Sequence, residues 1–81
     1  LKESLGRPRL RAWVSGRTLK VFAPKGEKLA IRLYDVAGRL AGSWEMKGSG
    51  EIRLPDLPAG VYHIRLSGRE AEASLRWLNA R

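Results

Sequence analysis

Two turn phrases decide the fold of this chain: YDVAGR at residues 34–39 and LPDLPAGVY at residues 54–62. Each lies between segments in which apolar and polar residues alternate, the pattern of a β-strand with one buried face. Gly38 is best able to take the positive φ of a tight hairpin with a bulge, and we expect Asp35 to accept backbone N–H groups beside it. In the second phrase two prolines end one strand, and Gly60 leads into the next.

Tyr62 stands at the start of a strand, directly after this proline corner. A tyrosine there can place its ring in a sandwich core while its hydroxyl bonds to the backbone upstream, an arrangement called a tyrosine corner. The plainer alternative is a core tyrosine without that bond. Either interpretation places Tyr62 in the interior.

The rest of the chain divides into short alternating runs. Seven are recognisable, at residues 9–15, 19–23, 29–34, 40–46, 51–54, 61–66 and 71–78. The last could also be a short helix, but Leu75 and Trp77 alternate with polar residues, which favours a strand. Seven strands at turn spacings of about 8 to 12 residues are typical of immunoglobulin-like domains. We predict an all-β, immunoglobulin-like β-sandwich of about seven antiparallel strands over residues 9–81, preceded by a linker or tail at residues 1–8.

The alternation also predicts which side chains face the core. The predicted inward residues are Leu10, Ala12, Val14, Leu19, Val21, Ala23, Leu29, Ile31, Leu33, Ile52, Leu54, Tyr62, Ile64, Leu66, Ala73, Leu75 and Trp77. After the first turn phrase, one face is predicted to hold Leu40, Gly42, Trp44 and Met46.

Three aromatic residues fall on the opposite faces of their strands. Trp13, Phe22 and Tyr34 alternate there with basic residues and could form a patch that stacks sugars or bases. The alternative, which we favour in so small a domain, is that these aromatics form the second half of the core.

The composition excludes several classes of protein. Eighty-one residues allow one domain, and without cysteine there is neither a disulfide framework nor a thiolate metal site. No apolar stretch approaches the roughly twenty residues of a membrane-spanning helix, and no signal peptide opens the chain. Because the sequence starts at Leu1 instead of methionine, we interpret it as an excised part of a longer protein.

The net charge of +8 is carried mainly by arginine, which supplies eleven of the sixteen basic residues. Because a guanidinium grips carboxylate or phosphate with two hydrogen bonds, the bias favours anionic partners. The candidate anion contacts are Arg11, Lys20, Arg32 and Arg65. The interpretation that we favour is an ordinary solvated surface, since the arginines are spread along the chain.

The sequence contains few residue patterns that are typical of a catalytic site. The single histidine, His63, has no serine–histidine–aspartate order near it and no metal-ligand spacing, and we interpret it as a surface strand residue. The glycines at 48 and 50 open no helix and so form no phosphate cradle. We predict a protein that is not an enzyme, with no cofactor, no metal and no nucleic-acid partner.

The order YDVAGR, then GSGEIRLPDLPAGVYHIRL at residues 48–66, resembles the C-terminal sorting domain of type IX (Por) secretion cargo, over roughly residues 19–78. The matching turn positions, which would define the fold, are Asp35, Gly38, Arg39, Leu57, Gly60 and Tyr62. The resemblance implies a domain that directs a larger protein across the outer membrane.

The partners that the resemblance implies are the type IX outer-membrane translocon, its shuttle protein and a cell-surface sortase. The sortase usually removes the domain and joins the cargo to anionic lipopolysaccharide. The implied route runs through the periplasm to the cell surface, the outer membrane or the medium. The expected recognition residues belong to the final strand: Leu75, Arg76, Trp77, Leu78 and Arg81.

Two alternatives stay open. In the first, the domain is retained in a surface component of the sortase-containing attachment complex, where its arginines bind anionic lipopolysaccharide. In the second, it is a generic immunoglobulin-like accessory or carbohydrate-binding module of a secreted enzyme.

Overall fold

A computed structural model describes residues 10–69 and 71–80, and these fold into strands and turns. The predicted tail at residues 1–8, and Arg9 at the start of the predicted domain, lie outside the described residues. The seven strands are β1 (Arg11–Ser15), β2 (Thr18–Phe22), β3 (Lys28–Tyr34), β4 (Leu40–Lys47), β5 (Gly50–Arg53), β6 (Gly60–Ser67) and β7 (Glu72–Asn79). The final run is therefore a strand, as predicted.

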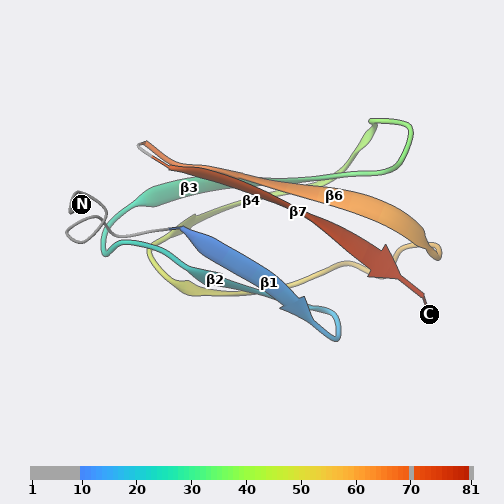
Figure 1. Ribbon diagram of the computed structural model, residues 1–81, viewed down its shortest axis with the longest axis horizontal. Helices are drawn as coiled ribbons and strands as arrows, with labels where there is room; N and C mark the ends of the chain where they lie inside the picture. Colours follow the sequence, from blue (N-terminus) through green and yellow to red (C-terminus); the bar gives the residue numbers. More distant parts are fainter. Residues whose placement is uncertain (1–9, 70, 81) are drawn as a thin grey trace, which may run out of the picture.

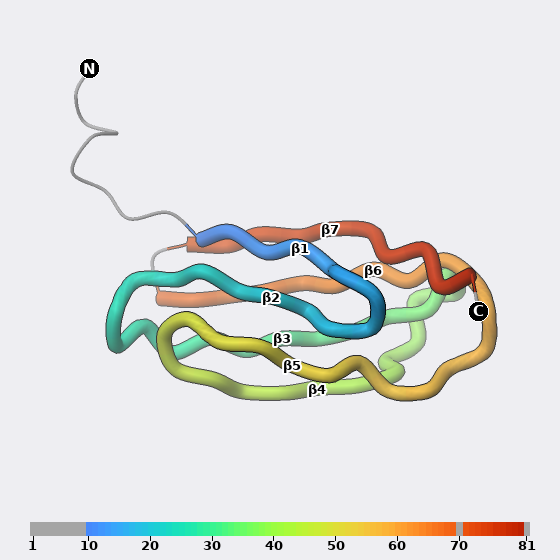
Figure 2. Tube along the Cα trace, turned by 90° about the horizontal axis from the view of Figure 1, so that it is seen from below, coloured from blue at the N-terminus to red at the C-terminus, as the bar shows by residue number. Residues whose placement is uncertain are grey.

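The strands form two antiparallel sheets, with the orders β1-β2-β5 and β4-β3-β6-β7. Figure 1 shows the sheets as two layers, with β3, β4, β6 and β7 above β1 and β2. Figure 2, seen from below, shows the edge strands β1 and β7 running along the same side of the sandwich. The prediction of an all-β, immunoglobulin-like sandwich is confirmed.

The core lies between the two layers and is supplied by alternate residues of the strands. In the central pair of the larger sheet, Ile31 stands opposite Leu66 and Leu33 opposite Ile64, and all four are fully buried. Burying an aliphatic side chain of this size contributes roughly 1.5–3 kcal/mol, so these few residues dominate the stability of so small a domain. The buried hydrophobic residues, each of which the alternation places inward, are Leu19, Val21, Ala23, Leu29, Ile31, Leu33, Leu54, Tyr62, Ile64, Leu66 and Trp77.

Two of the three outer-face aromatic residues are solvent-exposed and the third, Tyr34, is half-buried, contrary to the second core half that we favoured from the sequence. Trp13 is 48% exposed and Phe22 is 54% exposed, both on the outer face of the smaller sheet. Tyr34 lies on the outer face of the other sheet, opposite His63. The other interpretation, a single aromatic patch, is also wrong, because the three residues are divided between the two opposite sides of the sandwich.

Leu40 departs from the predicted face. Leu33 pairs with Gly42 whereas the next residue, Tyr34, pairs with Leu40, so Ala41 is the extra residue of a β-bulge. Ala41 packs against the core, and Leu40 is 56% exposed. The sequence predicts a hairpin with a bulge at Gly38, but the alternation was continued from Gly42 to Leu40 without the change of face that the extra residue Ala41 introduces.

The first turn phrase is held by the Asp35 side chain. Its Oδ1 accepts the backbone N–H groups of Ala37 and Arg39, both at 2.9 Å, and its Oδ2 accepts Nε of Arg39 at 3.2 Å. Gly38 has φ of 87°, a left-handed conformation that glycine adopts without a Cβ clash. The predicted roles of Asp35 and Gly38 in the turn are confirmed.

At the other end of the sandwich, two side chains link segments that are distant in the sequence. The Ser49 hydroxyl accepts the N–H of Ala23 at 2.9 Å and donates to the Ala23 carbonyl at 3.1 Å, which extends the pairing beyond β2. A Glu27 carboxylate oxygen accepts the backbone N–H of Arg69 at 2.6 Å, so the β2–β3 turn is bonded to the β6–β7 turn. Both ends of the sandwich are thereby closed by side-chain-to-backbone bonds.

We predict that Asp35 makes folding sensitive to acid. The N–H of Arg39 is the main influence that holds the pKa of Asp35 below its ordinary value of 3.8. Because the folded pKa is lowered, the stabilisation is present above pH 3.8 and is lost as the pH falls through the folded pKa.

The measurement is urea unfolding of the native protein and of Asp35→Asn between neutral pH and strong acid. The native protein should be the more stable at neutral pH, and the difference should shrink as the pH falls below the ordinary aspartate range. A difference that is independent of pH would contradict this role of the carboxylate.

Candidate functional site

The final strand, β7, divides its side chains between the core and the solvent. Trp77 is buried, at 5% exposure, and Leu75 is partly buried against the core. Arg76 and Leu78 point to the outer face, and Leu78 is 69% exposed. Arg81 lies outside the described residues. Of the expected recognition residues that the structure describes, only Arg76 and Leu78 are exposed to a partner of the folded domain.

Trp77 packs against the tyrosine of the second turn phrase. The rings of Tyr62 and Trp77 have centroids 5.4 Å apart and are tilted by 37°. The two residues are direct partners across β6 and β7, so the contact is a cross-strand aromatic pair inside the core. The final strand is thus packed against the corner that precedes β6.

The predicted tyrosine corner is present. The Tyr62 hydroxyl donates to the Pro58 carbonyl at 2.6 Å while the ring stays buried. The alternative of a core tyrosine without this bond is excluded. Leu57, within the same corner, packs against the core, and Gly60 begins β6 with φ of 156°.

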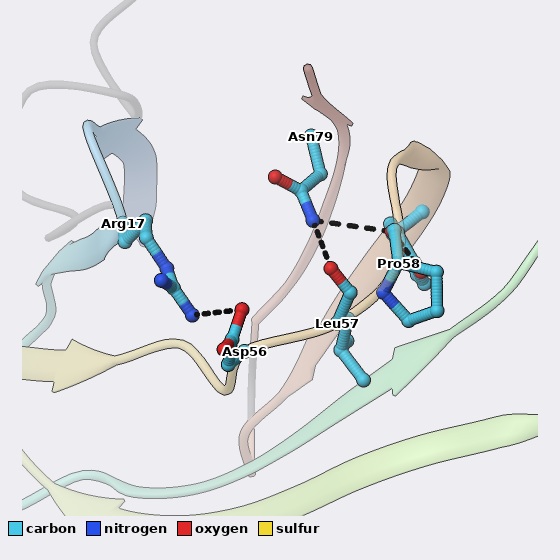
Figure 3. A network of polar contacts seen from close by, with 6 residues as sticks. Arg17, Asp56, Leu57, Pro58 and Asn79 are labelled. Atoms are coloured by element: carbon cyan, nitrogen blue, oxygen red, sulfur yellow. Dashed lines mark hydrogen bonds and ion pairs between the residues drawn. The ribbon is translucent and has the colours of Figure 1, made fainter. Parts of the chain in front are cut away.

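Asn79, which the sequence analysis did not single out, binds the same corner from the other side. Its Nδ2 donates to the carbonyls of Leu57 at 2.9 Å and Pro58 at 3.2 Å, as Figure 3 shows. Asn79 is 6% exposed and is the one buried polar residue of the described chain. The signal was present in the alternation, because Asn79 continues the inward series of Ala73, Leu75 and Trp77.

The corner is also attached to the β1–β2 hairpin. The Leu54 N–H donates to the Arg17 carbonyl at 2.8 Å, and the Arg17 guanidinium lies 3.4 Å from a carboxylate oxygen of Asp56 (Figure 3). Both charged side chains are substantially solvent-exposed, so the ion pair contributes at most about 1 kcal/mol. The backbone bond is the firmer of the two connections.

An opening of about 510 Å³ lies between the edge strands β1 and β7. It is lined by residues 12–14 and Gly16 on one side and by residues 75–78 on the other. Because β7 is the last strand of its sheet, one of its long sides has no neighbouring strand in that sheet. The expected recognition segment therefore borders both a free strand edge and a groove.

The four candidate anion contacts occupy two different faces. Arg11 and Lys20 lie on the outer face of the smaller sheet, where Lys20 stands opposite Glu51. Arg32 and Arg65 stand directly opposite each other on the outer face of the larger sheet. The structure therefore brings together one pair of the four, Arg32 and Arg65.

His63 is exposed on the outer face of β6, as predicted. Among residues 10–69 and 71–80, no group of three or more histidine, aspartate or glutamate side chains could hold a metal ion. The same residues contain no helix with the length and apolar character that crossing a membrane requires.

Comparison with known proteins adds no assignment, since no family model matches the sequence and no curated protein matches it. The fold defines the class of an immunoglobulin-like β-sandwich.

We predict that the two donors to the Pro58 carbonyl are energetically coupled. Asn79→Ala should destabilise the domain by about 1–3 kcal/mol because it leaves the Leu57 carbonyl without its side-chain donor, and Tyr62→Phe by about 0.5–1.5 kcal/mol. Since both donors share one acceptor, the double variant should depart from additivity by about 0.5 kcal/mol or more.

Urea unfolding of the native domain, the two single variants and the double variant measures these free energies. Ser74→Ala, on the outer face of β7, is the control. If the free energy of unfolding of Asn79→Ala equalled that of Ser74→Ala, the buried amide would not hold the corner.

Proposed function

We propose that this chain is a C-terminal sorting domain, which directs a larger protein across the outer membrane by type IX secretion and to the cell surface. The observation that carries the proposal is the position of the final strand. The residues expected for recognition lie on an edge strand and line the groove beside β1. The resemblance on which the proposal rests lies in the two turn phrases, which form a hairpin with a bulge and a tyrosine corner.

The domain acts in this proposal as a folded substrate, with no catalytic role. An extended segment of the translocon or its shuttle protein adds to the free edge of β7, a recurrent mode of recognition in which backbone hydrogen bonds give affinity. Arg76 and Leu78 then supply specificity from the outer face, while Leu75 and Trp77 keep the strand attached to the core. The sortase removes the domain after passage.

A second candidate is a domain retained on the cell surface, where it binds anionic lipopolysaccharide. The observation that favours it is the directly opposed pair Arg32 and Arg65. In this role the domain would remain attached to its parent protein after export.

The test is a secreted reporter fused ahead of this domain and expressed in a bacterium with type IX secretion. Reporter on the cell surface without the domain is the expected result. Surface reporter that still carries the domain would instead support the retained role. Reporter trapped in the periplasm would contradict both and favour an accessory module.

Removal of residues 79–81 is a poor test of recognition, because it would also remove the amide that binds the corner. The combined variant Arg76→Gln and Leu78→Ser changes only exposed side chains. We predict that it lowers surface reporter by about tenfold, the effect of losing about 1.4 kcal/mol of binding free energy.

The matched control combines Arg53→Gln with Leu40→Ser, an exposed arginine and an exposed leucine away from β7. The control should be exported like the native domain. Equal export of the β7 variant and the control would contradict recognition through the outer face of β7. Circular dichroism of the isolated domains checks that both variants fold.

A further inference from the structure

The strands at the edges of the two sheets differ in how well they are protected against pairing with another chain. β1 and β5 have only five and four residues, and short edge strands resist such pairing. β4 has eight residues but carries the β-bulge at Ala41, which twists its edge. β7 pairs with β6 through eight consecutive residues without a shift of register. In the part of the chain that the structure describes, β7 is the one edge strand that is both long and regular.

The bonds between β6 and β7 decide which backbone groups of β7 stay free. In the turn before β7, the Gly68 N–H donates to the Ala71 carbonyl at 2.7 Å. Because bonded and non-bonded pairs alternate in an antiparallel ladder, Ala73 and every second residue after it bond to β6. The residues whose N–H and C=O groups point to the free edge are Glu72, Ser74, Arg76 and Leu78.

The first three of these residues carry an acid, a hydroxyl and a base, in that order. Their side chains stand on the outer face of the sheet and are exposed. Within residues 10–69 and 71–80, neither Glu72 nor Arg76 takes part in an ion pair. Ser74 lies midway between the two charges. The order of these three residues is therefore complementary to itself when two copies of β7 run antiparallel.

Two copies of β7 can pair around a two-fold axis in several registers, and the charges favour one of them. With Ser74 on the axis, Glu72 of each copy stands directly opposite Arg76 of the other, and opposite charges in this position stabilise a sheet. With Arg76 on the axis, the two guanidinium groups would repel each other. With Leu75 on the axis, Arg76 would stand opposite Ser74, so neither direct ion pair would form.

We propose that the domain forms a two-fold dimer in which the β7 strands of two copies pair edge to edge, with Ser74 on the axis. The backbone groups of Glu72, Ser74 and Arg76 bond to those of the second copy, and an ion pair lies on each side of the axis. The two larger sheets become one continuous sheet. Because each copy uses the same surface, the contact closes after two copies and does not continue into a fibre.

This inference needs only the folded domain and is independent of the sorting role. In that role, a segment of the translocon or its shuttle protein adds to the same edge of β7, so a second copy would compete with it. Self-pairing is measured on the purified domain and sorting on an exported reporter. The failure of either proposal is therefore distinguishable from the failure of the other.

The test is analytical ultracentrifugation of the purified domain at concentrations from about 1 μM to about 1 mM, at constant ionic strength. We expect a reversible equilibrium between monomer and dimer. Hydrogen exchange at both ends of this range locates the contact. The amides of Glu72, Ser74 and Arg76 should exchange more slowly at the higher concentration, and those of β4 should exchange at the same rate.

Three outcomes of these measurements would overturn the proposal. The first is a monomer at every concentration. The second is a dimer in which protection appears at β1 or β4 while β7 is unchanged. The third is a dimer that persists on dilution because the two copies have exchanged whole strands.

Charge reversal tests the register. Glu72→Arg sets two guanidinium groups opposite each other, and Arg76→Glu sets two carboxylates there, so each variant should dimerise about tenfold more weakly. An equimolar mixture of the two variants restores both ion pairs in a heterodimer, and the double variant restores them in a homodimer. Because the two substitutions change the net charge in opposite directions, a general charge effect cannot weaken both. A mixture that associates as weakly as the single variants would overturn the register.

Glu45→Arg is the matched control, since Glu45 is an exposed acid on β4, at the opposite edge of the same sheet. It changes the net charge as Glu72→Arg does and should dimerise like the native domain. Equal weakening by the control and by Glu72→Arg would reduce the effect to net charge and overturn the proposal. Circular dichroism checks that each variant folds.

Discussion

The carbonyl of Pro58 is the acceptor on which the arrangement of the final strand depends. It receives the Tyr62 hydroxyl at 2.6 Å and the Asn79 amide at 3.2 Å, from the start of β6 and the end of β7. A corner with two prolines has few backbone donors of its own, so side chains must hold it in place. Through this one group, the segment that crosses between the sheets is tied to both of the last two strands.

This attachment separates two tasks within β7. Its inward residues, from Leu75 to the amide of Asn79, close the core and hold the corner. Its outward residues, Arg76 and Leu78, stabilise little because they are exposed, and they are available to a partner. The residues proposed for recognition, which are consecutive in the sequence, thus form two sets of side chains in the folded domain. In the proposed role, loss of the outward set would lower export without unfolding the domain, whereas loss of the inward set would destabilise the domain itself.

The strands and the turns could be predicted from the sequence because both depend on local chemistry. Gly38 and the two prolines restrict the backbone wherever they occur, and period-two alternation reports burial directly. The exposure of Trp13 and Phe22 could not be predicted in this way. Alternation tells which residues share a face but does not say whether another layer covers it.

The features that local patterns missed depend on contacts distant in the sequence. Alternation places Asn79 inward, but its bonds to the corner could not be predicted, because the partner carbonyls lie 21 and 22 residues away in the chain. The opposition of Arg32 and Arg65 requires the register between β3 and β6, which alternation alone does not determine. The candidate anion contacts were consequently selected by residue type, and only the register showed which of them meet.

The proposed role requires that a partner recognises the folded domain through the free edge of β7. Hydrogen exchange of the backbone amides tests it most directly, in the purified domain alone and in the presence of the type IX shuttle protein. We expect slower exchange on binding at the amides of β7 that are not bonded to β6, with β4 at the opposite edge unchanged. Protection confined to other strands, with β7 exchanging as in the free domain, would contradict it.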